Sequence, residues 1–186
     1  MSLLDRSIRY DEMISYGAAQ LYPEPQLRKW FGPRESITVH EALKSKAGVS
    51  RVLFLLMRPQ IVPDKVMHRI AIAACRMFLD RLAADGVYLD FRLRGFLCTK
   101  ERWINEEISL GALSTAQRAV QQLKQDLAEH PDPQTRLAVY AVSYAIQDDA
   151  ALAVKQVFYT SIKVYEDAAF ARSFQNFVRE QLEEIV

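Results

Sequence analysis

The stretch PDKVMHRIAIAACRMFLDRLAADGVYLDFRLRGFLCTKERWIN, residues 63–105, decides the fold of this chain. Pro63 stands where a helix can begin, because proline is tolerated at a first helical position. Gly86 is a natural terminator, because glycine readily adopts the left-handed conformation that ends many helices. Between them apolar residues recur at helical spacing along one broad face, from Val66 to Leu82. The pattern predicts a largely buried helix over 63–86.

A second helix is predicted from about Asp90 to Asn105. Its apolar residues are Phe91, Leu93, Phe96, Leu97 and Trp103. Only about four residues separate it from the first helix, and so short a connection favours an antiparallel hairpin.

Capping signals extend this helical pattern in both directions. Thr38–Glu41 matches a capping box, Ser114–Gln117 predicts the start of a helix that runs to about Glu129, and Asp132–Pro133 pairs an N-cap residue with a proline. Asp148 or Asp149 caps a further helix, and a last one carries Phe170 to Ile185. Nothing breaks the chain between Tyr165 and Ala168, so one long helix is an alternative there. The spacing also predicts a helix over about 3–21.

These segments predict an all-α protein: a compact bundle of roughly eight to ten helices with essentially no β-strand, since no window alternates apolar and polar β-branched residues. The length of 186 residues favours a single domain over 1–186. Within it we expect a core bundle over 63–186, with 1–60 either packed on the core or forming a peripheral helical extension.

Composition excludes several classes of protein. The net charge of +1 argues against a polybasic nucleic-acid coat and against a charge-driven disordered chain. The longest apolar run, Val52–Met57, is far shorter than the ~20 residues of a membrane span. Charges interrupt the first residues, so we expect no secretory signal. Two cysteines make no disulfide framework. We therefore expect a soluble cytoplasmic protein that does not bind membranes.

The small net charge conceals an uneven distribution. Residues 25–81 hold eleven basic and four acidic side chains, whereas residues 126–167 hold three basic and seven acidic ones. Such an asymmetry indicates either an interaction face or ordinary solvated helix surfaces.

Motifs that carry chemistry do not stand out. The histidines, His40, His68 and His130, lie in separate segments without ligand spacing, and no nucleotide-binding or nucleophile-elbow pattern occurs. We assign no catalytic, cofactor-binding or metal-binding residue, and we expect no cofactor. Cys75 and Cys98 lie about equally far from the turn of the hairpin, so their side chains either meet or are two separately packed thiols.

Part of the chain resembles a family of immunity proteins of bacterial toxin systems. The resemblance covers about 70–165 and rests on Ile72–Leu79, on Asp90-Phe91-Arg92-Leu93-Arg94, on Trp103 with Glu107-Ile108-Ser109-Leu110, and on the alanine-rich run Leu137–Val142. In that family D-x-R-x-R opens a helix and W-x-x-G-E-I-S closes it. Here Leu93 replaces the usual proline, and Glu106 stands at the position of the glycine. Membership implies an all-helical cytoplasmic protein that binds a toxin, without catalysis or cofactor.

The matched residues Asp90, Arg92, Arg94, Trp103 and Glu107 have two interpretations. As structural residues, Asp90 caps a helix, Arg92 or Arg94 pairs with a carboxylate such as Glu107, and Trp103 fills the seam between helices. As binding residues, they contact another protein, since Arg and Trp are enriched in binding hot spots.

Three other functions stay open from the sequence. The chain can be a small helical enzyme or a ligand-binding module with a pocket between helices. It can also be a structural or regulatory subunit that forms a homo-oligomer through its aromatic C-terminal segment. Binding of nucleic acid has the least support, because Arg92 and Arg94 do not share a helix face with each other and no helix-turn-helix signature accompanies Lys100 and Arg102.

Overall fold

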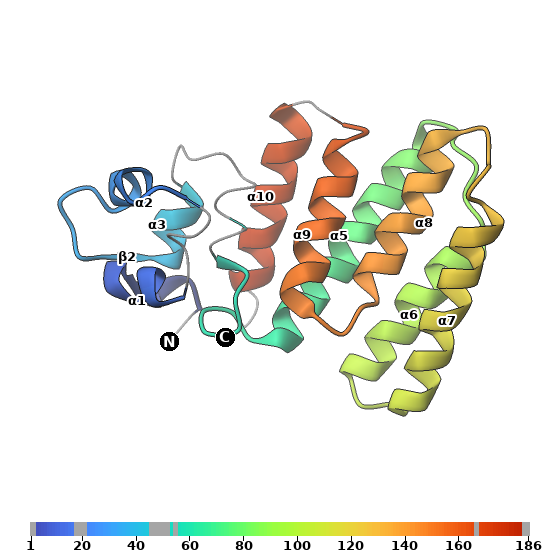
Figure 1. Cartoon of the computed structure of the whole chain (residues 1–186), viewed down its shortest axis with the longest axis horizontal. Helices are drawn as coiled ribbons and strands as arrows, with labels where there is room; N and C mark the ends of the chain where they lie inside the picture. Colours follow the sequence, from blue (N-terminus) through green and yellow to red (C-terminus); the bar gives the residue numbers. More distant parts are fainter. Residues whose placement is uncertain (1–2, 17–21, 45–52, 54–55, 166–167, 184–186) are drawn as a thin grey trace. The chain divides into compact units, whose positions relative to one another are not determined.

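The computed structural model describes residues 3–16, 22–44, 53, 56–165 and 168–183 (Figure 1). The chain divides into two compact units. One comprises Met1–Pro63 together with Ala171–Val186, and the other comprises Asp64–Phe170. The all-α class predicted from the sequence is confirmed, with one small two-stranded sheet in addition.

Five helices form the second unit. They are α5 (Asp64–Ala84), α6 (Arg92–Ile104), α7 (Leu110–Asp126), α8 (Pro133–Ala145) and α9 (Ala150–Ile162). The central helix, α5, packs against α6, α8 and α9, while α7 packs against α6 and α8. The interior face of α5 is fully buried, as at Ile70, Phe78 and Leu82. The predicted hairpin of α5 and α6 is therefore the centre of this unit.

The end of α5 shows why its sequence specifies a stop. Gly86 has φ of +79°, which glycine adopts without the steric cost that a side chain would bring. The amide of Gly86 donates to the carbonyl of Ala83 (3.1 Å), and the amide of Val87 donates to that of Leu82 (3.0 Å). These two bonds satisfy carbonyls that the helix itself leaves without partners.

Two predicted caps are confirmed. The side chain of Asp132 accepts from the amide of Gln134 (2.9 Å), and that of Asp149 accepts from the amide of Leu152 (2.9 Å). Asp149 rather than Asp148 is therefore the cap of α9.

The predicted start of α7 at Ser114 is wrong. Ser109 caps this helix: its backbone is extended, and its hydroxyl accepts from the amide of Ala112 (3.3 Å). The helix consequently begins at Leu110, and Ser114 lies inside it. It ends at Asp126, three residues before the predicted Glu129.

The alternative of one long C-terminal helix is also wrong. Helix α9 ends at Ile162, and a separate helix, α10, spans Ala168–Glu183. The amides of Val164 and Tyr165 both donate to the carbonyl of Ser161, which tightens the chain into a turn after α9.

Short elements make up the first unit. They are a 3₁₀ turn (Leu3–Asp5), β1 (Ser7–Arg9), α1 (Tyr10–Ser15), α2 (Glu24–Phe31), β2 (Ser36–Thr38) and α3 (Val39–Lys44). Strands β1 and β2 are antiparallel, with Ile8 opposite Ile37. Both isoleucines are buried, so the sheet contributes one apolar face to the core of this unit.

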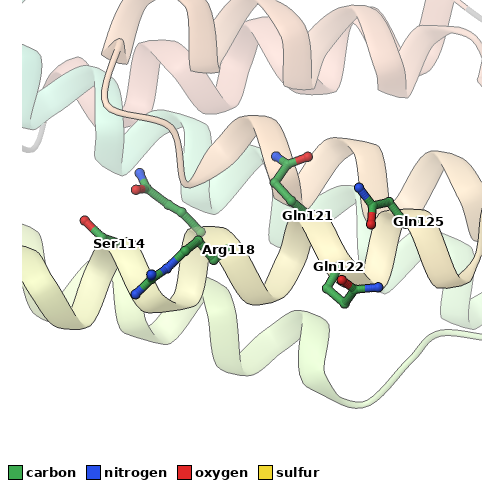
Figure 2. Close-up of a pocket in the computed structure, with 6 residues that line it drawn as sticks. Ser114, Arg118, Gln121, Gln122 and Gln125 are labelled. Atoms are coloured by element: carbon green, nitrogen blue, oxygen red, sulfur yellow. The ribbon is translucent and has the colours of Figure 1, made fainter.

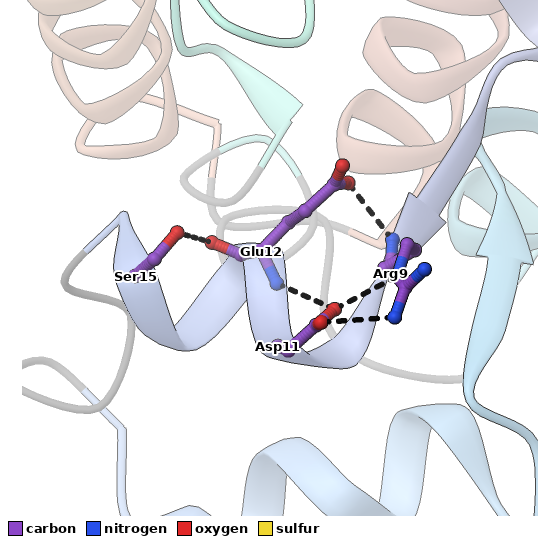
Figure 3. Close-up of polar contacts among 4 residues, drawn as sticks. All are labelled: Arg9, Asp11, Glu12 and Ser15. Atoms are coloured by element: carbon purple, nitrogen blue, oxygen red, sulfur yellow. Dashed lines mark hydrogen bonds and ion pairs between the residues drawn. The ribbon is translucent and has the colours of Figure 1, made fainter.

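The predicted helix over 3–21 is wrong in its first half. The chain pairs as β1 up to Arg9, and α1 then begins at Tyr10; residues 17–21 lie outside the described part of the chain. Figure 3 shows the reason. The amide of Arg9 donates to Glu12 Oε2 (3.1 Å), while the Arg9 guanidinium forms two 3.0 Å hydrogen bonds with Asp11. These bonds fix the change from strand to helix.

The capping box at Thr38 is confirmed. The amide of Glu41 donates to Thr38 Oγ1 (3.1 Å), and the amide of Thr38 donates to Glu41 Oε2 (2.8 Å). The backbone bond to Thr38 and the pairing with Arg34 lower the pKa of Glu41. The structure describes helix α3 as far as Lys44.

From Ala171 onward the chain groups with the first 63 residues, which the sequence did not lead us to expect. Phe174, Val178 and Leu182 follow one another at intervals of four, and all three are fully buried. This stripe supplies the C-terminal helix with its apolar face. Within the described ranges, no helix combines the length and the apolar character that crossing a membrane requires.

Candidate functional site

The five residues singled out from the sequence lie at two different ends of α6. Asp90 and Arg92 are at its beginning, Arg94 is in its first turn, and Trp103 and Glu107 are at or beyond its last turn. The structure therefore does not bring them together into one site.

Asp90 and Arg92 form a local clamp. Asp90 Oδ1 accepts from the Arg92 amide (2.9 Å) and from Arg92 Nε (2.9 Å), and Asp90 Oδ2 accepts from Arg92 Nη2 (2.8 Å). The Asp90 carboxylate is nearly buried, whereas about half of the Arg92 side chain is exposed. The hydrogen bonds from Arg92 lower the pKa of Asp90. The clamp thus holds an ionised pair in place at the start of α6.

Both arginines pair with a carboxylate, as the sequence led us to expect, but the carboxylate is not that of Glu107. Arg94 Nη2 lies 2.6 Å from Asp80 Oδ1, and Glu107 Oε2 lies 3.4 Å from Arg102 Nε. Helical geometry explains the difference, because Glu107 follows α6 and is more than three turns from Arg92.

Replacement of Arg94 by alanine is expected to change the free energy of unfolding by less than about 1 kcal/mol, because both members of the Arg94–Asp80 pair are more than half exposed. Urea denaturation of Arg94→Ala, Asp80→Ala and the double variant checks this. A coupling of the two residues above 2 kcal/mol would show instead that the pair holds α5 and α6 together.

Trp103 serves internal packing. Lys100 Nζ lies 4.0 Å from the centroid of its ring, and the His68 ring meets it edge to face at 5.7 Å. The predicted filling of the seam between helices is confirmed for Trp103, which contacts α5 through His68.

Lys100 lies in an environment that the sequence analysis did not predict. Grouped from the sequence with the basic residues of α6, it is in fact fully buried, and its ammonium group donates to the carbonyl of Gln147 (2.9 Å). Burial lowers the pKa of Lys100 to about 8, and the charge of Asp148 opposes this shift. A signal exists in the sequence: Leu93, Leu97, Lys100 and Ile104 follow helical spacing, and all four are buried.

Two further polar side chains, His68 and Gln117, lie near Lys100 and the turn between α8 and α9. Gln117 Nε2 donates to the carbonyl of Ile146 (2.9 Å) and to Asp148 Oδ1 (2.9 Å). His68 is 3% exposed, and its Nδ1 is buried without a hydrogen-bond partner among the described residues. Burial first, and the Lys100 charge second, lower the pKa of His68 to about 4. The side chains of Lys100 on α6 and Gln117 on α7 thus hold the turn between α8 and α9 in place.

The two cysteines do not meet. Cys75 is buried, Cys98 is exposed, and both are free thiols. Burial raises the pKa of Cys75, which makes it a poor nucleophile. Arg76 Nη2 contacts Cys98 Sγ at 3.7 Å. The structure therefore favours two separately placed thiols. Among the described residues, no three His, Cys, Asp or Glu side chains are grouped so as to hold a metal ion.

An open groove of about 610 Å³ runs along α7. Figure 2 shows its lining, which comes from this helix alone: Ser114, Gln117, Arg118, Gln121, Gln122 and Gln125. The lining contains amides, one hydroxyl and one guanidinium group, but no carboxylate, imidazole or thiol. It can donate and accept hydrogen bonds, but it offers no pair of groups for acid–base chemistry.

Two strongly exposed aromatic side chains lie in a connection between helices, away from the groove along α7. Phe91 is 87% exposed and Tyr88 is 60% exposed, both between α5 and α6. His130, between α7 and α8, stacks on the Tyr88 ring at 6.0 Å with the two planes 14° apart. Figure 1 shows both connections at the same end of these helices. We call Tyr88, Phe91, Arg92 and His130 the end surface.

Hydrogen bonds from residues of the two connections and from α8 fix the conformation of the end surface. Thr135 Oγ1 donates to the Tyr88 carbonyl (2.9 Å), and the Asp132 amide donates to His130 Nδ1 (3.2 Å). Together with the clamp between Asp90 and Arg92, these bonds order two connections that would otherwise lose conformational entropy on binding. Phe91 was counted among the apolar residues of the predicted helix from Asp90, but it lies just before α6, which begins at Arg92, and it is exposed.

Comparison with protein-family models, with curated proteins and with solved structures gave no match to this chain.

Proposed function

We propose that this chain is a non-catalytic protein-binding protein of the bacterial cytoplasm, of the kind that protects its own cell by binding a toxin directly. The observation that carries the proposal is the end surface. Two aromatic residues, Tyr88 and Phe91, are both more than half exposed on one ordered connection. Tyrosine and arginine are among the residue types that contribute most binding energy at protein interfaces.

The electrostatics of the end surface also suit a protein partner. Arg92 is exposed on one side and bound to Asp90 on the other, so its guanidinium group is oriented before any partner arrives. Stacking on His130 orients the Tyr88 ring before binding, which reduces the side-chain entropy that binding removes. The surface thus combines an apolar centre with an ordered charge.

The resemblance to immunity proteins gains support from Glu106. Its φ is +63°, in the left-handed region that side chains other than glycine rarely adopt. This is the position at which that family carries glycine. The turn after α6 consequently has the conformation for which a glycine is the natural choice, although this chain places glutamate there.

Affinity capture from a lysate of the source organism tests the proposal. We expect the wild-type protein to retain one stoichiometric protein partner at high salt, because the contact is largely apolar. The double variant Tyr88→Ser/Phe91→Ser should lose this partner while keeping its fold, since both side chains are exposed.

Leu110→Ser is the matched control. Leu110 is 59% exposed, nearly the same as Tyr88, but it lies at the start of α7 and outside the end surface. The control should retain the partner. Equal capture by all three proteins would place the interface elsewhere, and capture of nothing by the wild type would contradict the proposed function.

A further inference from the structure

A second concave surface lies in the unit formed by the two ends of the chain. Its volume is about 290 Å³, and its walls are the last residues of α3 and one face of α10. The lining residues are Leu43, Lys44, Arg172, Gln175, Asn176 and Arg179. We call it the basic groove.

Helical spacing builds one wall of the basic groove. Arg172, Gln175, Asn176 and Arg179 stand at positions i, i+3, i+4 and i+7 of α10, which places them on the same side of the helix. Gln175 joins this wall to the other, because its Nε2 donates to the carbonyl of Leu43. This bond connects α10 to the last described turn of α3.

Positive charge exceeds negative charge in the basic groove. Within the described part of the chain, the exposed side chains of Lys44 and Arg172 form no hydrogen bond or ion pair. Among the described residues, Arg179 forms an ion pair with Glu183, whose Oε1 lies 3.7 Å from Arg179 Nε. This Nε is buried, and no hydrogen bond of the described residues satisfies it. Three cationic groups therefore line one concave surface, and its lining residues in the described part of the chain include no carboxylate.

We propose that the basic groove binds the phosphate group of a phosphate monoester. Two guanidinium groups supply planar pairs of donors that match phosphate oxygens, and the lysine adds a third positive charge. A dianion satisfies these three charges better than a single carboxylate does. The amides of Gln175 and Asn176 add uncharged hydrogen-bonding groups beside the cations, and the volume leaves room for an organic part next to the phosphate. This inference goes beyond toxin binding and does not depend on it.

Titration of the ¹⁵N-labelled full chain with inorganic phosphate and with phenyl phosphate tests the proposal by NMR. Sodium chloride keeps the ionic strength constant, and phenol serves as the analogue without phosphate. The Nε–H resonance of Arg179 reports directly on the buried donor. We expect saturable shifts of the Arg179 and Arg172 Nε–H resonances with both phosphates and none with phenol, with phenyl phosphate binding more tightly than inorganic phosphate.

Two charge-matched variants complete the test. Arg172→Gln/Arg179→Gln removes two cations from the basic groove and should weaken phosphate binding at least about tenfold. Arg102→Gln/Arg118→Gln removes two exposed cations from the other unit and should leave it unchanged. Equal weakening in both variants, or shifts that track ionic strength alone, would overturn the proposal. So would the absence of any saturable shift in the wild-type protein, a result that does not depend on either variant being folded.

Discussion

Acidification from pH 6.5 to pH 4 is expected to remove about 2–3 kcal/mol from the free energy of unfolding through His68 alone. The folded state holds this residue neutral, because burial and the charge of Lys100 lower its pKa to about 4. In the unfolded chain a histidine takes up its proton near pH 6.5. Between these two values the unfolded state binds a proton that the folded state does not, so stability falls as the pH falls. Each pKa unit corresponds to about 1.4 kcal/mol.

Urea denaturation at a series of pH values measures this loss. Trp103 is a local probe, since its ring lies 5.7 Å from that of His68, and a Trp30→Phe background removes the chain's other tryptophan. The variant His68→Leu should lose less stability than the wild type between pH 6.5 and 4. The matched control His40→Leu leaves His68 in place and should keep the full loss. If His68→Leu and the wild type lose stability equally, His68 does not hold a neutral form in the folded state.

Replacement of Phe91 by alanine is expected to weaken partner binding by at least about 2 kcal/mol, or roughly 30-fold, without a measurable effect on stability. The two effects separate because Phe91 is 87% exposed in the free protein and therefore contributes almost nothing to the core. In a complex the whole ring would leave water, which accounts for the binding energy.

Isothermal titration with the captured partner measures the first effect, and urea denaturation measures the second. Leu110→Ala is the control, because it truncates an exposed apolar side chain outside the end surface and should alter neither quantity. A loss of stability in Phe91→Ala that matches its loss of binding would show that the residue serves the fold rather than the partner.

The sequence predicts the fold best where one local signal determines an element. Pro63 and Gly86 bound α5 to within two residues, and the caps Thr38, Asp132 and Asp149 each lie where their hydrogen-bonding chemistry requires. The prediction fails where two signals compete. Ser109 and Ser114 are both acceptable caps, and the backbone conformation at Ser109 decides between them.

Long-range pairing accounts for the other failures. Leu3 to Leu21 shows helical spacing, yet residues Ser7–Arg9 pair with Ser36–Thr38, and a three-residue strand is too short to show alternation in the sequence. The grouping of the C-terminal helix with the N-terminal segments likewise depends on contacts between distant residues, such as that of Gln175 with Leu43.

The candidate site was predictable only in part. The sequence drew attention to Asp90 and Arg92. Arg92 belongs to the end surface, and Asp90 and Arg92 pair with each other. Phe91 and Lys100 each lie in an environment that is unusual for their residue type: the aromatic side chain is exposed, and the charged one is buried. The position of each residue relative to the helix, rather than its hydrophobicity, determines whether it is buried. A strongly exposed aromatic side chain on an ordered connection is an exception of the kind that marks a binding surface.

Amide hydrogen exchange of the protein, free and bound to its captured partner, tests the central claim most directly. The account predicts that binding slows exchange in the two connections that form the end surface, residues 85–92 and 127–132, while α10 exchanges as in the free protein. Protection confined to other segments, with these two connections unchanged, would contradict a function carried by the end surface.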